Sequence, residues 1–173
     1  MKLKIIFVDG YNVLNSWPGF KSEIQESFEN ARKKLTDVMH NYGTYTNSRV
    51  ILVFDGYKVN GNMQNKEEIN KNLTIVYTKD GETADSYIER NVHLMGRRAE
   101  IYVVTSDGLE QQTIFQRGAA RISSLEFYNE IIKMNEIVRF STEQSKSSDK
   151  NHLQDNVDLE VLKKLEEIRR GHF

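Results

Sequence analysis

The chain of 173 residues contains no cysteine. Disulfide bonds, cysteine-based zinc sites and thiol catalysis are therefore excluded. No apolar run approaches the roughly 20 residues that a membrane-spanning helix needs. The first apolar stretch, Ile5 to Val8, ends at Asp9 and is too short for the hydrophobic region of a signal peptide. Together these absences predict a cytoplasmic protein.

The chain also lacks an excess of charge of either sign. Its 24 Lys and Arg stand against 25 Asp and Glu, which gives a formal net charge of −1. A domain that binds nucleic acid unaided is usually basic, because Lys and Arg make the contacts to phosphate. A nucleic-acid substrate would therefore need a local basic patch, a bound metal or a third partner. With 38% hydrophobic and 28% charged residues, the composition is that of a globular domain with its own core.

Four apolar runs rich in β-branched residues predict buried strands. They are Leu3–Val8, Arg49–Phe54, Leu73–Thr78 and Ile101–Thr105, with a shorter strand at Ala120–Ile122. Between them, apolar residues recur at helical spacing. The helices that this spacing predicts cover residues 22–42, 84–95, 108–117 and about 124–138. Strands that alternate with helices are typical of an α/β fold, so we expect a three-layer, doubly wound, mainly parallel sheet.

The C-terminal part of the chain changes character after residue 140. Residues 141–156 are mostly polar and predict a linker or a mobile loop. An apolar stripe then predicts a final amphipathic helix over about 157–170. The stripe consists of Val161, Leu162, Leu165 and Ile168. Two interpretations of this helix stay open, since it can cover the domain formed by residues 1–140 or dock a partner.

Asp-Gly pairs follow predicted strands at four places. The aspartates of these pairs are Asp9, Asp55, Asp80 and Asp107. Any single Asp-Gly pair is commonly no more than a turn. The carboxyl ends of parallel strands, however, share one edge of the sheet, and ligands bind in the crevice there. We therefore expect Asp9, Asp55 and Asp107 to converge in space.

Further polar residues are predicted at the same edge. Glu82 and Asp85 lie one helical turn apart where the helix 84–95 begins, so both can face the edge. Acidic residues at this place also serve simply to cap a helix, and spacing alone does not separate the two interpretations. Asn12 can orient water or phosphate, or bind loop backbone. Ser106 can bind phosphate or metal-bound water, or serve as a turn serine.

A gathering of carboxylates is unfavourable unless cations or protons neutralise it. Oxygen ligands without cysteine, and with four scattered histidines, suit Mg²⁺ or Mn²⁺ rather than zinc. A carboxylate-held cation of this kind polarises a phosphoryl oxygen and activates water. The pattern therefore predicts phosphodiester hydrolysis.

Residues for contacting the substrate are less sharply marked. Lys79, Arg117 and Arg121 are the basic residues expected nearest the acidic edge, and we take them as candidate phosphate contacts. Three aromatic residues lie in predicted loops, where they can stack on bases or pack on their own domain. They are Trp17, Phe20 and Tyr57.

Five short segments, taken together, resemble the YacP-like NYN-domain family of the PIN-like nuclease superfamily. They are Asp9-Gly10-Tyr11-Asn12, Val53-Phe54-Asp55, Glu82-Thr83-Ala84-Asp85, Thr105-Ser106-Asp107 with Glu110-Gln111, and Gly118-Ala119. The resemblance covers nearly the whole chain, from about residue 3 to 170. It implies a metal-dependent endoribonuclease associated with ribosome-dependent cleavage of messenger RNA, leaving a 5′-phosphate and a 3′-hydroxyl.

The resemblance also assigns roles to residues. It implies that Asp9 and Asp85 are catalytic, joined by Asp107, Asn12 and Glu82. The implied ligands of Mg²⁺ or Mn²⁺ are Asp9, Asp55, Asp85 and Asp107. By their expected positions near this edge, and not by the resemblance, the predicted RNA contacts are Lys79, Ser106, Arg117 and Arg121. The nuclease domain would comprise residues 1–140.

Other function classes fit less well. A non-catalytic module that binds RNA or the ribosome stays open as the alternative, although it gives no reason for so many carboxylates at one edge. Phosphohydrolases of the haloacid-dehalogenase type need Asp-x-Asp after the first strand, and this chain has Asp9-Gly10-Tyr11 there.

Overall fold

The computed structural model describes residues 3–56, 65–96, 99–106 and 119–155, with side chains as far as Glu143. Its centre is a sheet with the strand order β3-β4-β2-β1-β5-β6. The parallel strands are β1 (Lys4–Asp9), β2 (Arg49–Phe54), β4 (Leu73–Tyr77), β5 (Glu100–Val104) and β6 (Ala120–Ile122). The mainly parallel α/β sheet predicted from the sequence is confirmed, strand by strand.

One strand escaped prediction. β3 (Asn65–Asn70) pairs antiparallel with β4 at the edge of the sheet. Its sequence, Asn-Lys-Glu-Glu-Ile-Asn, is polar, and five of its six residues are exposed. An edge strand of this kind buries neither face, so it lacks the apolar signal of the central strands.

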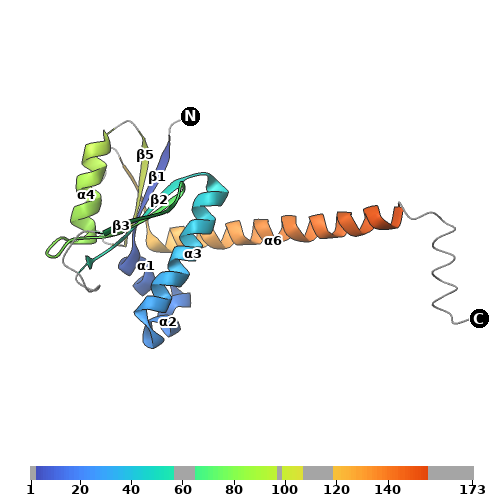
Figure 1. Cartoon of the computed structure of the whole chain (residues 1–173), viewed down its shortest axis with the longest axis horizontal. Helices are drawn as coiled ribbons and strands as arrows, with labels where there is room; N and C mark the ends of the chain where they lie inside the picture. Colours follow the sequence, from blue (N-terminus) through green and yellow to red (C-terminus); the bar gives the residue numbers. More distant parts are fainter. Residues whose placement is uncertain (1–2, 57–64, 97–98, 107–118, 156–173) are drawn as a thin grey trace, which may run out of the picture. The chain divides into compact units, whose positions relative to one another are not determined.

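Helices cover both faces of the sheet (Figure 1). On one face α4 (Ala84–Met95) packs its Ala84, Tyr87, Ile88 and Val92 against inward-facing residues of the strands. On the other face lies α3 (Phe28–Thr46) with its buried Leu35, Met39 and Tyr42. β1 is buried from both sides, since Ile5 and Phe7 belong to the α4 cluster while Ile6 and Val8 alternate with them. The three layers follow from this double burial.

The helix expected over residues 22–42 is divided in two. α2 (Lys21–Glu26) ends at Ser27, and α3 begins directly afterwards. The Ser27 backbone is extended, and its hydroxyl accepts hydrogen bonds from the N–H groups of Glu29 and Asn30. An N-cap serine therefore interrupts an apolar spacing that by itself looks continuous.

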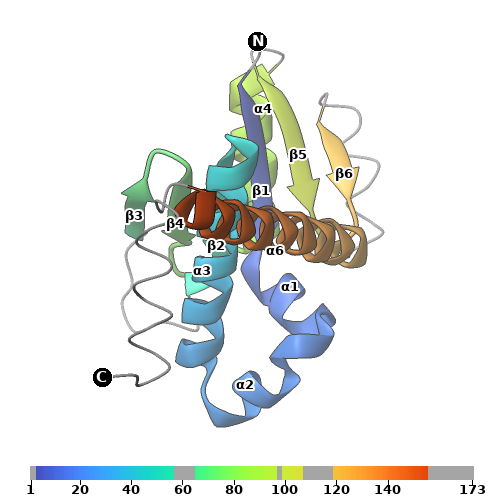
Figure 2. The ribbon, with the colours of Figure 1, turned by 90° about the vertical axis from the view of Figure 1, so that its right-hand side faces the viewer.

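Short helical segments also occupy the region after β1, where a loop was expected. α1 (Gly10–Ser16) begins immediately at the strand end, and a 3₁₀ turn follows over Pro18–Phe20. Figure 2 shows α1 at the end of the sheet to which β1 and β5 run. The first strand thus passes directly into a helix at the edge where the carboxylates were predicted.

The last described helix, α6 (Ser124–Asp155), is longer than predicted. Its start is fixed by a reciprocal capping box, in which Ser123 N donates to Glu126 Oε2 (2.8 Å) and Glu126 N donates to Ser123 Oγ (3.2 Å). The segment 141–156, predicted as a linker or loop, is helical as far as Asp155. It contains neither proline nor glycine, and Arg139 pairs with Glu143 one turn on (3.1 Å).

The chain forms two compact units, Met1–Ile131 and Ile132–Phe173. The helices predicted over 108–117 and 157–170 lie outside the described residues, so they stay predictions. Among the helices that the structure describes, none combines the length and the apolar character needed to cross a membrane.

Gly56, just after β2, lies close against the backbone at the end of β4. A Cβ atom added to Gly56 would lie 1.7 Å from the carbonyl oxygen of Thr78. The Gly56 N–H donates to the Thr78 hydroxyl (3.0 Å). Because the atom in the way belongs to the backbone, no side-chain rotation can relieve the clash.

We therefore predict that Gly56→Ala lowers the free energy of unfolding by about 3 kcal/mol or more. Gly19→Ala is the matched control, because a Cβ at Gly19 meets nothing within 4 Å and should change stability by less than about 0.5 kcal/mol. Urea denaturation of both variants measures the difference. Equal urea midpoints for the two variants would show that the close approach of Gly56 to Thr78 does not constrain the fold.

Candidate carboxylate site

Asp9 ends β1 and caps α1. Its Oδ1 accepts a hydrogen bond from the N–H of Asn12 (3.0 Å). The pKa of the Asp9 carboxyl is raised from 3.8 to about 7, chiefly by burial, while the Asn12 N–H opposes the rise. The charges of Asp85 and Asp55 contribute to this rise, Asp85 also through a hydrogen bond between the two carboxyl groups. The structure thus places Asp9 close enough to Asp55 and Asp85 for their charges to act on it.

Asp55 and Asp85 reach this place from different elements. Asp55 directly follows β2, and its Oδ1 accepts a hydrogen bond from the N–H of Ala84 (2.6 Å). Ala84 is the first residue of α4, and Asp85 lies in the first turn of that helix. Asp55 therefore holds the start of α4 against the end of β2, and this places Asp85 near Asp9.

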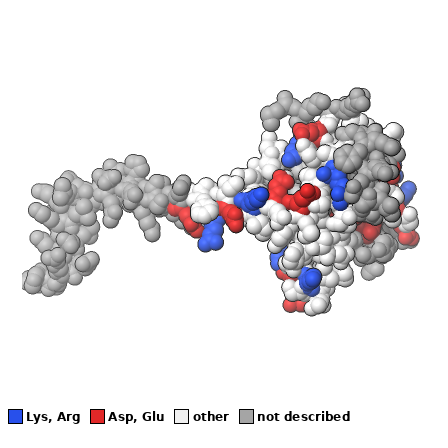
Figure 3. Space-filling view, turned by 180° about the vertical axis from the view of Figure 1, so that it is seen from behind, with Lys and Arg blue, Asp and Glu red and all other residues white. Residues whose placement is uncertain are grey.

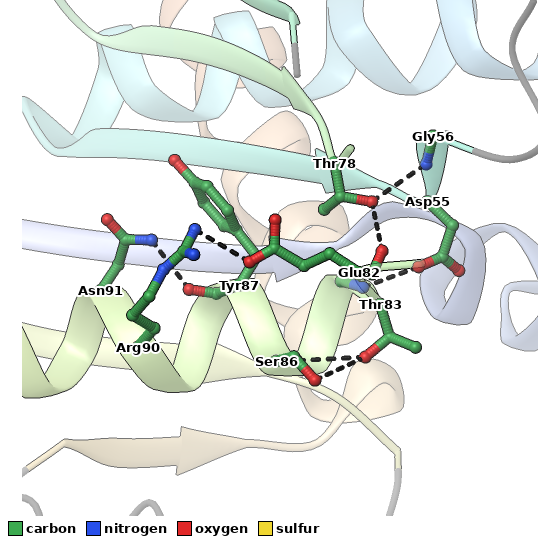
Figure 4. A network of polar contacts seen from close by, with 10 residues as sticks. Asp55, Gly56, Thr78, Glu82, Thr83, Ser86, Tyr87, Arg90 and Asn91 are labelled. Atoms are coloured by element: carbon green, nitrogen blue, oxygen red, sulfur yellow. Dashed lines mark hydrogen bonds and ion pairs between the residues drawn. The ribbon is translucent and has the colours of Figure 1, made fainter. Parts of the chain in front are cut away.

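A second set of hydrogen bonds supports the same corner (Figure 4). The buried Thr78 hydroxyl accepts from Gly56 N and donates to the carbonyl oxygen of Glu82 (2.6 Å). Thr83 caps α4 by accepting from Ser86 N (3.2 Å). Sequence reasoning missed Thr78, because a threonine at the end of an apolar run reads as one more strand residue. The one sequence signal for Thr78 is its position two residues before Asp80-Gly81, at the end of a predicted strand.

Glu82 lies apart from the three aspartates. Its Oε1 accepts from Arg90 Nη2 (2.8 Å), and its side chain is only 8% exposed. Figure 4 shows the side chain directed toward Tyr87 and Arg90, away from Asp55. Its Oε2 is buried without a hydrogen-bond partner among the described residues. This placement resembles a helix-stabilising ion pair, while the catalytic role predicted for Glu82 stays a prediction.

Asn12 links the first and fourth predicted strand ends. Its Oδ1 accepts a hydrogen bond from the N–H of Ser106 (3.0 Å), and its own N–H is bound by Asp9. Both contacts involve backbone, as the second interpretation of Asn12 expected. Ser106 is exposed at the same edge. Asp107, the next residue, lies outside the described residues, and its predicted convergence stays a prediction.

The predicted RNA contacts are placed only in part. Lys79 is exposed just after β4, and Arg121 lies in β6 with its Nε buried and without a partner among the described residues. Arg117 lies outside the described residues. On the face that Figure 3 shows, basic and acidic described side chains are interspersed. The described residues on that face therefore form no broad basic patch for phosphate.

Two of the loop aromatics turn inward. Trp17 and Phe20 are 2% and 4% exposed, and Trp17 Nε1 donates to the carbonyl oxygen of Ser124 (2.9 Å). Their rings pack on the domain itself, so they offer no surface for bases. Tyr57, the third aromatic, lies outside the described residues.

The aspartates suit a hard cation by their chemistry. Their ligand atoms are all oxygens, which suits Mg²⁺ or Mn²⁺. Burial and the charges of Asp85 and Asp55 raise the pKa of Asp9, so a bound cation would relieve an unfavourable charge there. Among the described residues, no three His, Asp or Glu side chains are close enough together to hold a metal ion. The residues present fit part of a ligand set, and Asp107 is the candidate for completing it.

Comparison with known proteins identifies the family. A model of the YacP-like NYN domain matches residues 6–170. The chain is 37% identical over 170 residues to YacP of Bacillus subtilis (strain 168), and the match covers 98% of each protein.

Solved structures agree with the sequence match. The crystal structure of Rae1 (YacP) from Bacillus subtilis matches with a TM-score of 0.70 at 37% identity, over 96% of this chain and 95% of that one. A crystal structure of a single-residue mutant of the same protein gives 0.71 at 35% identity over 83% of each chain. The chain therefore belongs to the YacP-like NYN domain family, whose domain is of the nuclease type.

Proposed function

We propose that the protein is a metal-dependent endoribonuclease whose active site is the edge that carries Asp9, Asp55 and Asp85. The observation that carries the proposal is the approach of these carboxylates from β1, β2 and α4. Burial, and then the charges of Asp85 and Asp55, raise the pKa of Asp9 to about 7. Repulsion between carboxylates does not stabilise a fold, so a cluster of them is better explained by a function, here the binding of a cation and a phosphate substrate. Membership of a nuclease-type family supports the same reaction class.

The described residues divide the work. Asp9 and Asp85 would hold Mg²⁺ or Mn²⁺, joined by Asp107 and the second oxygen of Asp55. When bound, the cation would polarise the scissile phosphate and lower the pKa of a water molecule. Asn12 holds the backbone of Ser106 beside it, which fixes the position of the segment that leads to Asp107.

The substrate we propose is messenger RNA held by a partner. The chain carries a formal net charge of −1, and its active edge is itself acidic, so its own attraction for RNA is weak. A ribosome presents messenger RNA already fixed in place, which raises the local concentration of the strand. Ribosome-associated cleavage in the cytoplasm follows from this argument and from the resemblance stated above. A non-catalytic RNA- or ribosome-binding module is the alternative.

Asp9→Asn and Asp85→Asn should each lower the rate of RNA cleavage in Mn²⁺ by at least about a hundredfold. Asn keeps the cap on α1, so the Asp9 variant should stay folded. The matched control is Asp80→Asn, since Asp80 is the aspartate of another Asp-Gly pair and is exposed. Cleavage of a labelled RNA by all four proteins is the measurement. Wild-type rates in both variants, or no cleavage by any protein, would leave the binding module as the better account.

Asp9 should also make stability depend on pH. Its folded-state pKa of about 7 lies above the ordinary 3.8, so the folded chain binds the extra proton. Stability in EDTA should therefore fall as the pH rises from about 4 to 7. Asp9→Asn removes this loss. Relative to wild type, its free energy of unfolding should rise by on the order of 2 kcal/mol between pH 5 and 8. A difference that does not change with pH would contradict the burial of an uncompensated carboxyl.

Cleavage of a message that ribosomes are translating should be much faster than cleavage of the same message without ribosomes, at physiological salt. The reason is the weak intrinsic attraction between this chain and phosphate. The two rates, together with co-sedimentation of the protein with ribosomes, are the measurements. Matching rates would mean a free-standing ribonuclease and would refute the ribosome part of the proposal alone.

A further inference from the structure

Arg32 of α3 forms a hydrogen bond with α1, the short helix that follows Asp9. Arg32 is half-buried in the second turn of α3. Its Nη1 donates to the hydroxyl of Tyr11 (3.1 Å). Tyr11 is the second residue of α1, the helix that Asp9 caps. The position of the Arg32 guanidinium is therefore tied to the same short helix as the catalytic candidate.

A row of aromatic rings places this arginine at the carboxyl ends of the strands. The ring of Tyr11 lies 5.2 Å from that of Phe54, and Phe54 stacks on Tyr77 at 5.6 Å. Phe54 ends β2 immediately before Asp55, and Tyr77 ends β4. The rings thus lie at the edge that carries the aspartates, on the face opposite α4. Phe28, 44% exposed, packs edge-on against Tyr11 at 6.1 Å.

Among the residues that the structure describes, no carboxylate forms an ion pair with Arg32. Glu29 and Glu67 are the acidic residues whose charges act on the same ring, Tyr77, as that of Arg32. Neither forms an ion pair with Arg32, and no other described residue does. Burial raises the pKa of Tyr77, while the positive charge of Arg32 lowers it. The guanidinium therefore lies beside aromatic side chains, with one N–H on Tyr11 and its other donors without a partner in the described part of the chain.

We propose that Arg32 binds a backbone phosphate of the RNA strand that lies across the carboxylate edge, with Tyr11 holding the guanidinium in position. A planar guanidinium with free donors forms paired hydrogen bonds to phosphate oxygens. The exposed ring of Phe28 beside it suits an unpaired base. The inference rests on the proposed function, and it adds a cationic contact from the α3 face to the candidates Lys79, Arg117 and Arg121.

The test measures RNA binding apart from cleavage. It uses the full chain carrying Asp9→Asn, a labelled single-stranded RNA, Mg²⁺, and salt between about 50 and 200 mM. Adding Arg32→Gln keeps an N–H for Tyr11 but removes the charge. This should weaken binding about tenfold and reduce the slope of log affinity against log salt by about 0.7, the value for one phosphate contact to a single strand.

Two further variants make the result specific. Lys33→Gln removes the same charge from the exposed neighbouring residue and should leave the salt slope unchanged. Arg32→Lys should retain the slope while losing part of the affinity, since a lysine supplies the charge without the planar fork. If melting curves show that the Arg32→Gln variant is unfolded, Arg32→Lys becomes the informative variant. Full retention of RNA affinity by Arg32→Lys would then count against the proposal.

Any of three results would overturn the proposal. They are equal salt slopes for Arg32→Gln and the parent, equal effects of the Arg32 and Lys33 changes, and no RNA binding by the parent. Failure of the nuclease proposal looks different. In that case the wild-type chain cleaves no RNA, whatever the salt slopes. A wild type that cleaves RNA, combined with an unchanged slope in Arg32→Gln, refutes the Arg32 contact alone.

Discussion

The hydrogen bond from the Ala84 N–H to the Asp55 carboxylate is the contact on which the candidate site depends. It joins the end of β2 to the first residue of α4 over 2.6 Å, and α4 carries Asp85 toward Asp9. A negative charge at a helix N-terminus is favourable, because the first N–H groups of the helix are otherwise unpaired. Part of the cost of bringing carboxylates together is thus offset by satisfying the helix end. The same carboxylate that stabilises α4 also raises the pKa of Asp9.

The buried parts of the fold could be predicted because burial leaves a pattern in the sequence. β1 and β2 are covered on both faces, and strands of this kind have continuous apolar runs such as Ile5–Val8. β3 left no such pattern, since it lies exposed at the edge. The break at Ser27 was hidden for a different reason. Apolar spacing continues across it, and only the extended backbone of the serine separates α2 from α3.

The candidate site was predictable as a set of residue types, but its contacts were not. Parallel topology explains why Asp9 and Asp55 approach one another although far apart in sequence. Nothing in the sequence indicates that Asp55 binds Ala84, 29 residues away, or that Glu82 turns toward Arg90. These choices depend on side-chain packing after the strands and helices have assembled. Arg32 escaped notice because its partner, Tyr11, comes from another helix.

The burial of Trp17 has a practical consequence. It is the only tryptophan in the chain, and its indole N–H bonds to Ser124 where α6 begins, while Ser16 and Ser124 share a hydrogen bond of 2.5 Å. Trp17 directly follows α1, the helix that Asp9 caps. The intrinsic fluorescence of the protein therefore comes from one indole at one junction. Any loosening between the helix next to the carboxylates and the start of α6 would shift the emission to longer wavelength, so the molecule carries its own optical reporter for that junction.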